Sequence, residues 1–134
     1  MRQGKPKASL RCLIVEDDEL QIEEFLDLLP ALGHSVVGTA ATVEDAIKMA
    51  EEREVDVAIV DLLLRRRGFG GDVAELLLKR CGIPSVIVSA YPTPEHRDIA
   101  TSLGVVGFVP KPLDPSALDA FLARVAEQAE TNVA

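Results

Sequence analysis

Acidic, hydroxyl and basic side chains stand at the ends of several apolar segments of this sequence. Glu16 and Asp17 follow one such segment, and Asp61 ends the run that begins at Val57, where it is the only charge as far as Leu64. Ser89 ends a third apolar segment, and Lys111 follows a fourth. Carboxylates gathered at one place repel each other, which raises their pKa values unless a cation joins them. If the fold brings these residues together, they could bind a charged ligand and act on it chemically.

Mg²⁺ fits such a group, because this hard cation accepts a few carboxylates and keeps part of its hydration shell. A lysine beside the metal would compete with it, unless a polyanion such as a phosphoryl group lies between Mg²⁺ and the ammonium. Ser89 can donate a hydrogen bond to another oxygen of that group. A carboxylate can also act as the nucleophile and form an acyl phosphate. The residue types therefore predict phosphoryl chemistry that requires Mg²⁺.

Five apolar segments have the length and the Val- and Ile-rich composition of β-strands. Three of them are nearly continuous, as expected of strands covered on both faces. Segments with helical periodicity separate them. This alternation predicts an α/β fold, a doubly wound sheet of five parallel strands with helices on both faces. The predicted strands are Leu10–Val15, Ser35–Ala40, Val55–Val60, Ser85–Ser89 and Val105–Val109.

Capping residues support the helices between these strands. Thr42, Thr93 and Asp114 each stand where a side chain can cap a first turn, and the last two directly precede a proline. The weakest apolar stripe is that of the segment 94–103. In an open parallel sheet, ligands bind outside the carboxyl ends of the strands, where the strand order reverses. The predicted fold therefore brings the acidic, hydroxyl and lysine side chains to one crevice.

Length and composition indicate one folded domain. The 134 residues are 48% apolar and 27% charged, and we expect a domain at 10–129 between flexible tails at 1–9 and 130–134. The net charge of −8 argues against direct nucleic-acid binding. No apolar run has the length of a membrane span, which predicts a cytoplasmic protein without membrane contact. Cys12 and Cys81 lack metal-ligand spacing, so we expect reduced thiols.

Each candidate residue also has a purely structural interpretation. Asp17 or Asp18 can cap a helix, and Asp61 can be a turn residue. Ser89 is a common type of residue at a strand end, and Lys111 before a proline is usually a solvated lysine. The convergence of the candidates on one predicted edge favours the functional interpretation.

The sequence resembles the receiver domain of two-component response regulators from about Leu10 to Ala129. The matching motifs, in order along the chain, are "LIVEDDEL", "AIVDLLL", "VIVSAY" and "GFVPKPL". The resemblance implies a flavodoxin-like strand order 2-1-3-4-5 and a cis Lys111–Pro112 peptide bond. "IPSVIVSAY" also resembles a subgroup of stand-alone receivers whose fourth strand ends in a hydroxyl residue, a small residue and tyrosine.

Roles for individual residues follow from the same resemblance. Asp61 would be the phosphoacceptor, Lys111 its charge partner, and Glu16 and Asp17 the Mg²⁺ ligands. The backbone carbonyl of Leu63 would also bind the metal. The remaining roles belong to the switch and its surroundings: Ser89 is the switch hydroxyl, Phe108 the switch aromatic and Ala90 the small neighbour that leaves room for the phosphoryl group.

The implied function is that of a stand-alone response regulator, a phosphoacceptor rather than an enzyme. A histidine kinase or histidine phosphotransfer protein would supply the phosphoryl group. An effector protein or a second copy of the chain would bind the Phe108 face. Two alternatives stay within the family, a phosphate sink and a pseudo-receiver that works without phosphorylation. A flavodoxin-like cofactor module is disfavoured, because "EDDE" after the first strand would repel a bound phosphate.

The loop after Asp61 departs from the family pattern. Many receivers have Met-Pro at the positions of Leu64 and Arg65, whereas this loop holds Gly68, Gly70 and Gly71. Without the proline we expect a more mobile loop. The run Arg65–Arg67 is most simply a solvated segment, and the alternative is a docking patch for an acidic partner.

The first prediction concerns the lifetime of the phosphoryl group. Hydrolysis needs a water in line with the leaving carboxylate oxygen. In receivers, the side chains at the positions of Leu63 and Tyr91 flank that approach. Since Leu63 cannot bind water and Tyr91 is bulky, we expect slow self-dephosphorylation. Leu63→Asn combined with Tyr91→Glu should speed the loss of label in a phosphate-release assay. Unchanged decay would refute shielding without touching the assignment of Asp61.

Overall fold

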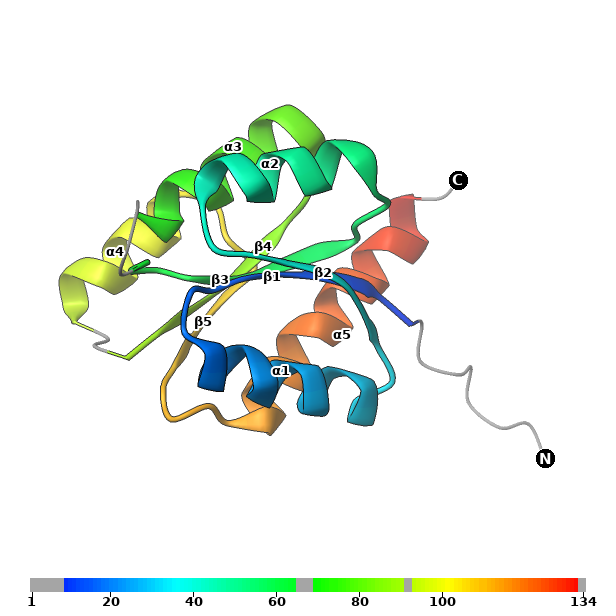
Figure 1. The fold of residues 1–134 in the computed structure, drawn as a ribbon, viewed down its shortest axis with the longest axis horizontal. Helices are drawn as coiled ribbons and strands as arrows, with labels where there is room; N and C mark the ends of the chain where they lie inside the picture. The colour runs from blue at the N-terminus through cyan, green and yellow to red at the C-terminus, as the bar shows by residue number, and fades with distance from the viewer. Residues whose placement is uncertain (1–8, 65–68, 91–92, 133–134) are drawn as a thin grey trace.

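The computed structural model describes residues 9–64, 69–90 and 93–132 of the chain. Within these residues, five parallel strands form one sheet in the order β2-β1-β3-β4-β5, as predicted. Helices follow the strands and cover both faces of the sheet (Figure 1). In chain order the elements are β1 (Arg11–Val15), α1 (Glu19–Ala31), β2 (Ser35–Ala40), α2 (Val43–Glu52), β3 (Val57–Asp61), α3 (Gly70–Cys81), β4 (Ser85–Ser89), α4 (Pro94–Ser102), β5 (Gly107–Pro110) and α5 (Pro115–Asn132).

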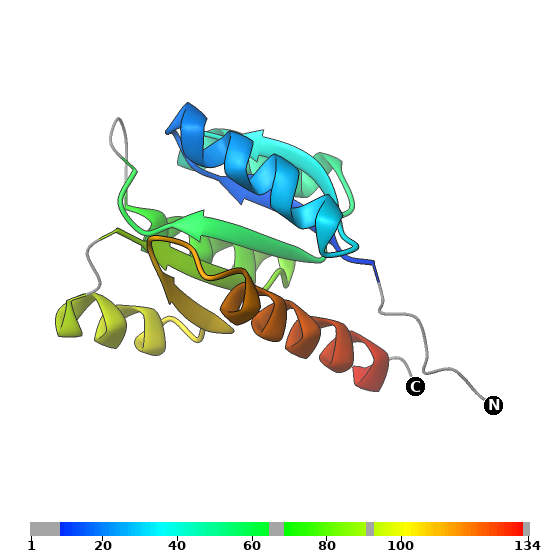
Figure 2. The same ribbon diagram turned by 90° about the horizontal axis from the view of Figure 1, so that it is seen from below.

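Two apolar clusters lie on opposite faces of the sheet. α1 and α5 lie on the same side of the sheet in both views (Figures 1 and 2), and they pack Phe25, Leu29, Leu118 and Leu122 against it. The other cluster joins the opposite face to α2 and α3. Every residue of β3 and β4 is buried, which explains why those segments are continuously apolar. The phosphoacceptor candidate thus ends one of the most buried strands.

The predicted helix signals are confirmed where the structure describes them. The Thr42 hydroxyl oxygen accepts from the Asp45 N–H at 3.1 Å, and Thr93 does the same for His96. The Asp114 carboxylate accepts from the Ser116 N–H at 3.0 Å at the start of α5. Gly82 ends α3 at a φ of 68°, a left-handed conformation that glycine adopts without steric cost.

Several element boundaries differ from the predicted ones. β3 begins at Val57 and includes Asp61, and β5 spans Gly107–Pro110. The parallel ladders begin at the pairs Cys12–Val57 and Val86–Gly107, so pairing rather than apolarity determines where each strand starts. α5 spans Pro115–Asn132.

Both cysteines are free thiols, as predicted. Burial raises the pKa of the Cys12 thiol to about 12, which keeps it protonated and unreactive at neutral pH. Among the described residues, no helix combines the length and apolarity needed to cross a bilayer.

Two residues of α1 test how much the apolar cluster between the sheet and helices α1 and α5 contributes to stability. Phe25 is 1% exposed and Leu26 is 42% exposed on the same helix. Phe25→Ala should lower the free energy of unfolding by about 3–5 kcal/mol, because it leaves a cavity. Leu26→Ala should change it by about 0.5 kcal/mol or less, as is usual at the surface. Urea unfolding measures both, and equal losses would contradict this packing.

Candidate functional site

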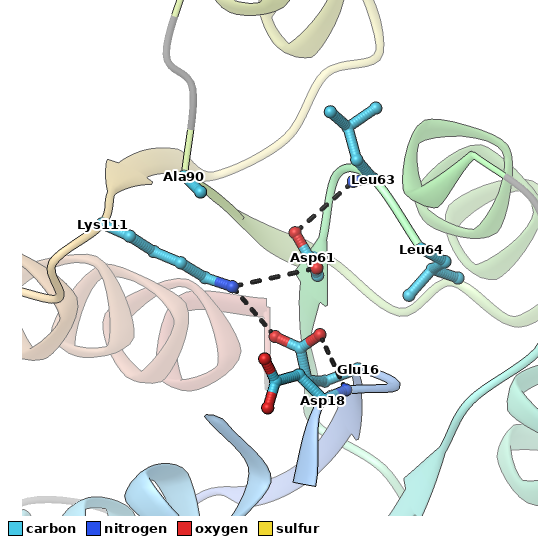
Figure 3. A pocket seen from close by; sticks show the side chains of 7 residues that line it. All are labelled: Glu16, Asp18, Asp61, Leu63, Leu64, Ala90 and Lys111. Carbon is cyan, nitrogen blue, oxygen red and sulfur yellow. Dashed lines mark hydrogen bonds and ion pairs between the residues drawn. The ribbon is translucent and has the colours of Figure 1, made fainter. Parts of the chain in front are cut away.

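The carboxyl ends of β1, β3 and β5 meet around a cleft of about 280 Å³ (Figure 3). The fold brings them together because β1 and β3 are neighbours at the point where the strand order reverses. Glu16, Asp61 and Lys111 point toward one another in this cleft, whereas the Leu63 side chain extends away from them. The cleft is lined by Glu16, Asp18, Asp61, Leu63, Leu64, Ala90 and Lys111.

Glu16 is held from two sides in the buried part of the cleft, where it is 1% exposed. Its Oε1 lies 3.0 Å from the Lys111 Nζ. Its Oε2 accepts from the backbone N–H groups of Asp17 at 3.1 Å and Asp18 at 3.4 Å. These contacts satisfy both oxygens, which a buried carboxylate requires. Glu16 therefore lies fixed beside the loop that leads into α1.

Asp61 lies between the lysine and its own loop. Its Oδ2 is 3.8 Å from the Lys111 Nζ, and its Oδ1 accepts from the Leu63 N–H at 3.4 Å. Burial, together with the neighbouring Glu16, raises the pKa of Asp61 to about 7. Lys111 and the Leu63 N–H act in the opposite direction but do not offset these effects. The carboxylate of Asp61 thus lacks sufficient compensating charge.

The acidic residues have the composition of a divalent-cation site. Glu16, Asp17 and Asp61 each offer a carboxylate oxygen, and these oxygens lie within 4.8 Å of one another. Glu16 and Asp61 share the ammonium of Lys111, yet burial and the neighbouring Glu16 still raise the pKa of Asp61. A hard divalent cation with oxygen ligands would stabilise the charged carboxylates. The cluster is therefore consistent with the Mg²⁺ site predicted from the sequence.

The structural interpretation is correct for Asp18, whose Oδ1 accepts from the Leu20 N–H at 2.9 Å as the N-cap of α1. Asp18 also lines the cleft, but it is outside the group of three carboxylates. Asp17 belongs to that group instead. Asp18 thus caps α1, whereas the neighbouring Asp17 belongs to the carboxylate group.

The remaining predicted residues lie at the ends of β4 and β5. Ser89 is buried, and its carbonyl accepts from the Lys111 N–H at 2.7 Å. Phe108 is half-buried on β5, and the Arg97 guanidinium carbon lies 5.0 Å from the centre of its ring. The Lys111–Pro112 peptide bond is cis, as the resemblance implies. Tyr91 and the run Arg65–Arg67 lie outside the described residues.

Two contacts at the site were not anticipated from the sequence. Arg97 lies over Phe108, and no periodicity or motif marks that arginine as special. Gly70 lies against the backbone that follows Asp61, and the glycine cluster of this loop was the available indication. The flanks of the loop are also joined, because Leu63 and Phe69 form an antiparallel bridge. The mobility of the loop itself stays a prediction.

A doubly wound α/β fold with an acidic cleft at its carboxyl edge narrows the class of protein, and comparison with known proteins defines it. The chain matches the family model of the response regulator receiver domain over residues 12–123. It belongs to this family. Receiver domains are the signalling phosphoacceptors of two-component systems, and their partners are histidine kinases.

Curated relatives cover different parts of the chain. Over 81 residues it is 35% identical to the phyllosphere-induced regulator PhyR of Methylorubrum extorquens, a match that covers 60% of this chain and 30% of PhyR. It is 29% identical over 108 residues to the transcriptional regulatory protein PdtaR of Mycobacterium tuberculosis, which covers 81% of this chain and 52% of PdtaR. The chain thus spans about half or less of the length of these relatives.

Solved structures agree on the fold. The signal receiver domain of a modulated diguanylate cyclase from Desulfovibrio desulfuricans has a TM-score of 0.83 and 24% identity, covering 92% of this chain and 98% of that one. A CheY-like receiver domain protein from Methanospirillum hungatei has a TM-score of 0.79 and 24% identity, covering 93% of this chain and 100% of that one. At this identity the likeness shows the fold alone.

The raised pKa of Asp61 predicts how stability depends on pH in metal-free protein. Between the ordinary carboxyl pKa of 3.8 and about 7, the folded state holds a proton that the unfolded state releases. The free energy of unfolding therefore falls as pH rises through this window. Asp61→Asn removes the effect and should stabilise the protein by about 1–3 kcal/mol at pH 8 but little at pH 4. Urea unfolding at both pH values measures it, and a gain independent of pH would contradict the assignment.

Proposed function

We propose that Asp61 accepts a phosphoryl group from a phosphohistidine on a histidine kinase or histidine phosphotransfer protein. The observation that carries the proposal is the position of Lys111, whose Nζ lies 3.0 Å from Glu16 and 3.8 Å from Asp61 inside the acidic cleft. An ammonium there can contact an anion attached to Asp61 while it remains beside Glu16. Without such an anion, a divalent cation and the ammonium would compete for the same carboxylates.

In the proposed transfer, an oxygen of the Asp61 carboxylate attacks phosphorus. An O–P bond forms as the P–N bond to the donor histidine breaks, so the phosphoryl group passes directly to Asp61. The Lys111 ammonium offsets charge on the phosphoryl oxygens, and Ala90 at the cleft wall leaves space for them. Later hydrolysis returns the carboxylate and releases phosphate, which ends the signal.

Glu16, Asp17 and Asp61 would hold the Mg²⁺ ion together with the backbone carbonyl of Leu63. When bound, the ion supplies positive charge to the transferring phosphoryl group. The Leu63 N–H already faces Asp61 Oδ1, and in extended backbone the N–H and C=O of one residue point to the same side. This orientation supports Leu63 as the source of the carbonyl ligand.

The proposed output is a change at the face that carries Phe108. Ser89 is the candidate hydroxyl that would hydrogen-bond to the phosphoryl group, and it lies at the end of β4 beside β5. Its movement toward that group would alter the packing next to Phe108. An effector protein or a second copy of this chain would then distinguish the two states.

Substitution of Asp61 tests the acceptor directly. Asp61→Asn keeps the side-chain volume but removes the nucleophilic carboxylate, so label from a phosphorylated histidine kinase or from acetyl phosphate with Mg²⁺ should be lost. Asp18→Asn is the matched control, because asparagine still caps α1 and the nucleophile is intact. Intact-mass measurement follows both variants. Labelling of Asp61→Asn at the wild-type rate would refute the proposal.

Lys111→Ala separates metal binding from switching. The variant should still bind Mg²⁺, since the three carboxylates remain, but phosphorylation should no longer shift the NMR signals of Phe108. If wild-type protein is never labelled while it still binds a partner, the pseudo-receiver alternative is correct.

A further inference from the structure

The first residue of α3 lies directly against the peptide group that follows the proposed phosphoacceptor. The Gly70 N–H donates to the Leu62 carbonyl at 2.7 Å. A Cβ atom at position 70 would lie 1.9 Å from the Asp61 carbonyl oxygen and 2.8 Å from its carbonyl carbon. Side chains do not approach backbone atoms this closely, so any residue other than glycine must displace either α3 or the Asp61 backbone.

The same peptide group is anchored on its opposite side. The Leu62 N–H donates to the Val88 carbonyl on β4 at 2.9 Å, and the Leu62 side chain is fully buried. The backbone after Asp61 is therefore held between β4 and the first turn of α3. β4 is buried along its whole length, so it cannot easily move aside if a side chain at position 70 pushes the Asp61 backbone toward it.

The position of this backbone determines the geometry around the Asp61 side chain. Leu63 follows directly, pairs with Phe69 across the loop and donates its N–H to Asp61 Oδ1. The proposed carbonyl ligand also belongs to Leu63. A shift at Gly70 thus moves a hydrogen-bond donor to the phosphoacceptor and a proposed metal ligand together.

We propose that Gly70 is a positioning residue for the phosphoacceptor site. Because Gly70 has no side chain, α3 can come close enough to the backbone after Asp61 for the Gly70 N–H to donate to the Leu62 carbonyl. This close packing sets the distance of Asp61 and Leu63 from Glu16 and Asp17. The inference rests on the proposed function of Asp61 and adds a residue outside the acidic cleft to the machinery. Gly70 touches neither metal nor phosphoryl group, so it acts only through the backbone.

The size of the expected effect follows from the clash. Restoring an acceptable contact requires a displacement of about 1 Å, since real Cβ atoms stay beyond 3.0 Å. Misplacement by about 1 Å can reduce the rate of a reaction about 10²-fold. Loss of a group that orients metal ligands typically weakens metal binding or activity about 10–100-fold. Gly70→Ala should therefore raise the Mg²⁺ dissociation constant and slow phosphorylation, each by about 10-fold or more.

Gly71→Ala is the matched control in the same helical turn. A Cβ atom there would lie 2.3 Å from the Phe69 ring, a side chain, rather than against the Asp61 backbone. Both variants replace a buried glycine at the start of α3, so both alter stability. Only Gly70→Ala should change the Mg²⁺ dissociation constant, measured by NMR titration of the Leu63 amide, and the labelling rate. Equal dissociation constants and labelling rates in the two variants would overturn the proposal.

Hydrogen exchange in the unmutated protein provides a second test that does not depend on the folding of a variant. If the Gly70–Leu62 bond supports the metal site, Mg²⁺ must stabilise that bond in return, because coupling between two sites is reciprocal. Saturating Mg²⁺ should therefore slow exchange of the Gly70 N–H more than that of the Gly71 N–H. Equal slowing would overturn the inference. Failure of the unmutated protein to become labelled would instead refute the proposed function of Asp61.

Discussion

The buried contact of Lys111 with Glu16 and Asp61 is the constraint on which the site depends. Glu16, which follows β1, and Asp61, at the end of β3, share one ammonium, which Lys111 provides from beyond β5. Removing one partner of a buried ion pair costs more than the pair itself contributes, because the remaining charge stays in a poorly solvated place. The Lys111–Glu16 contact therefore requires that the strand ends at this edge of the sheet stay in place relative to one another. A rigid core holds them there.

The core supplies this rigidity through two inner strands of the sheet. β3 and β4 are buried along their whole length, so the ends that carry Asp61 and Ser89 are as firmly placed as the interior. Burial of Asp61, together with the neighbouring Glu16, raises its pKa and so reduces the stability of the metal-free protein at neutral pH. The apolar clusters on both faces offset it. The proposed Mg²⁺ ion and phosphoryl group would each meet opposite charge in this cleft, from the carboxylates and from Lys111.

The sequence predicted the open parallel sheet, the capping residues and the gathering of the acidic side chains, because each depends on a local pattern combined with a general rule for parallel sheets. The strand order followed from the resemblance to receiver domains. The sequence did not predict the limits of β3 and β5, since the pairing partner decides where a ladder begins. The contacts of Gly70 and Arg97 were also missed. The glycine cluster around Gly70 marked a close approach but not its partner, and the residues around Arg97 gave no indication of its contact. Periodicity in the sequence predicts helices and strands, but it does not predict which of their residues come into contact in the fold.

The missed contacts lie on the two routes by which the cleft reaches the rest of the molecule. Gly70 connects the backbone of Asp61 to α3, whereas Arg97 connects the ring of Phe108 to α4. The Ser89 carbonyl and the Lys111 N–H, 2.7 Å from nitrogen to oxygen, join the ends of β4 and β5 next to the cleft. If a phosphoryl group draws Ser89 and Lys111 toward Asp61, this bond moves both strand ends as one. The Arg97–Phe108 contact is a side-chain interaction next to β5 that can change, because a cation–π pair with an exposed arginine contributes only about 1 kcal/mol, less than the cost of breaking the buried ladder. The proposed signal would therefore leave the cleft through α4 and β5, while α3 holds the phosphoacceptor in place.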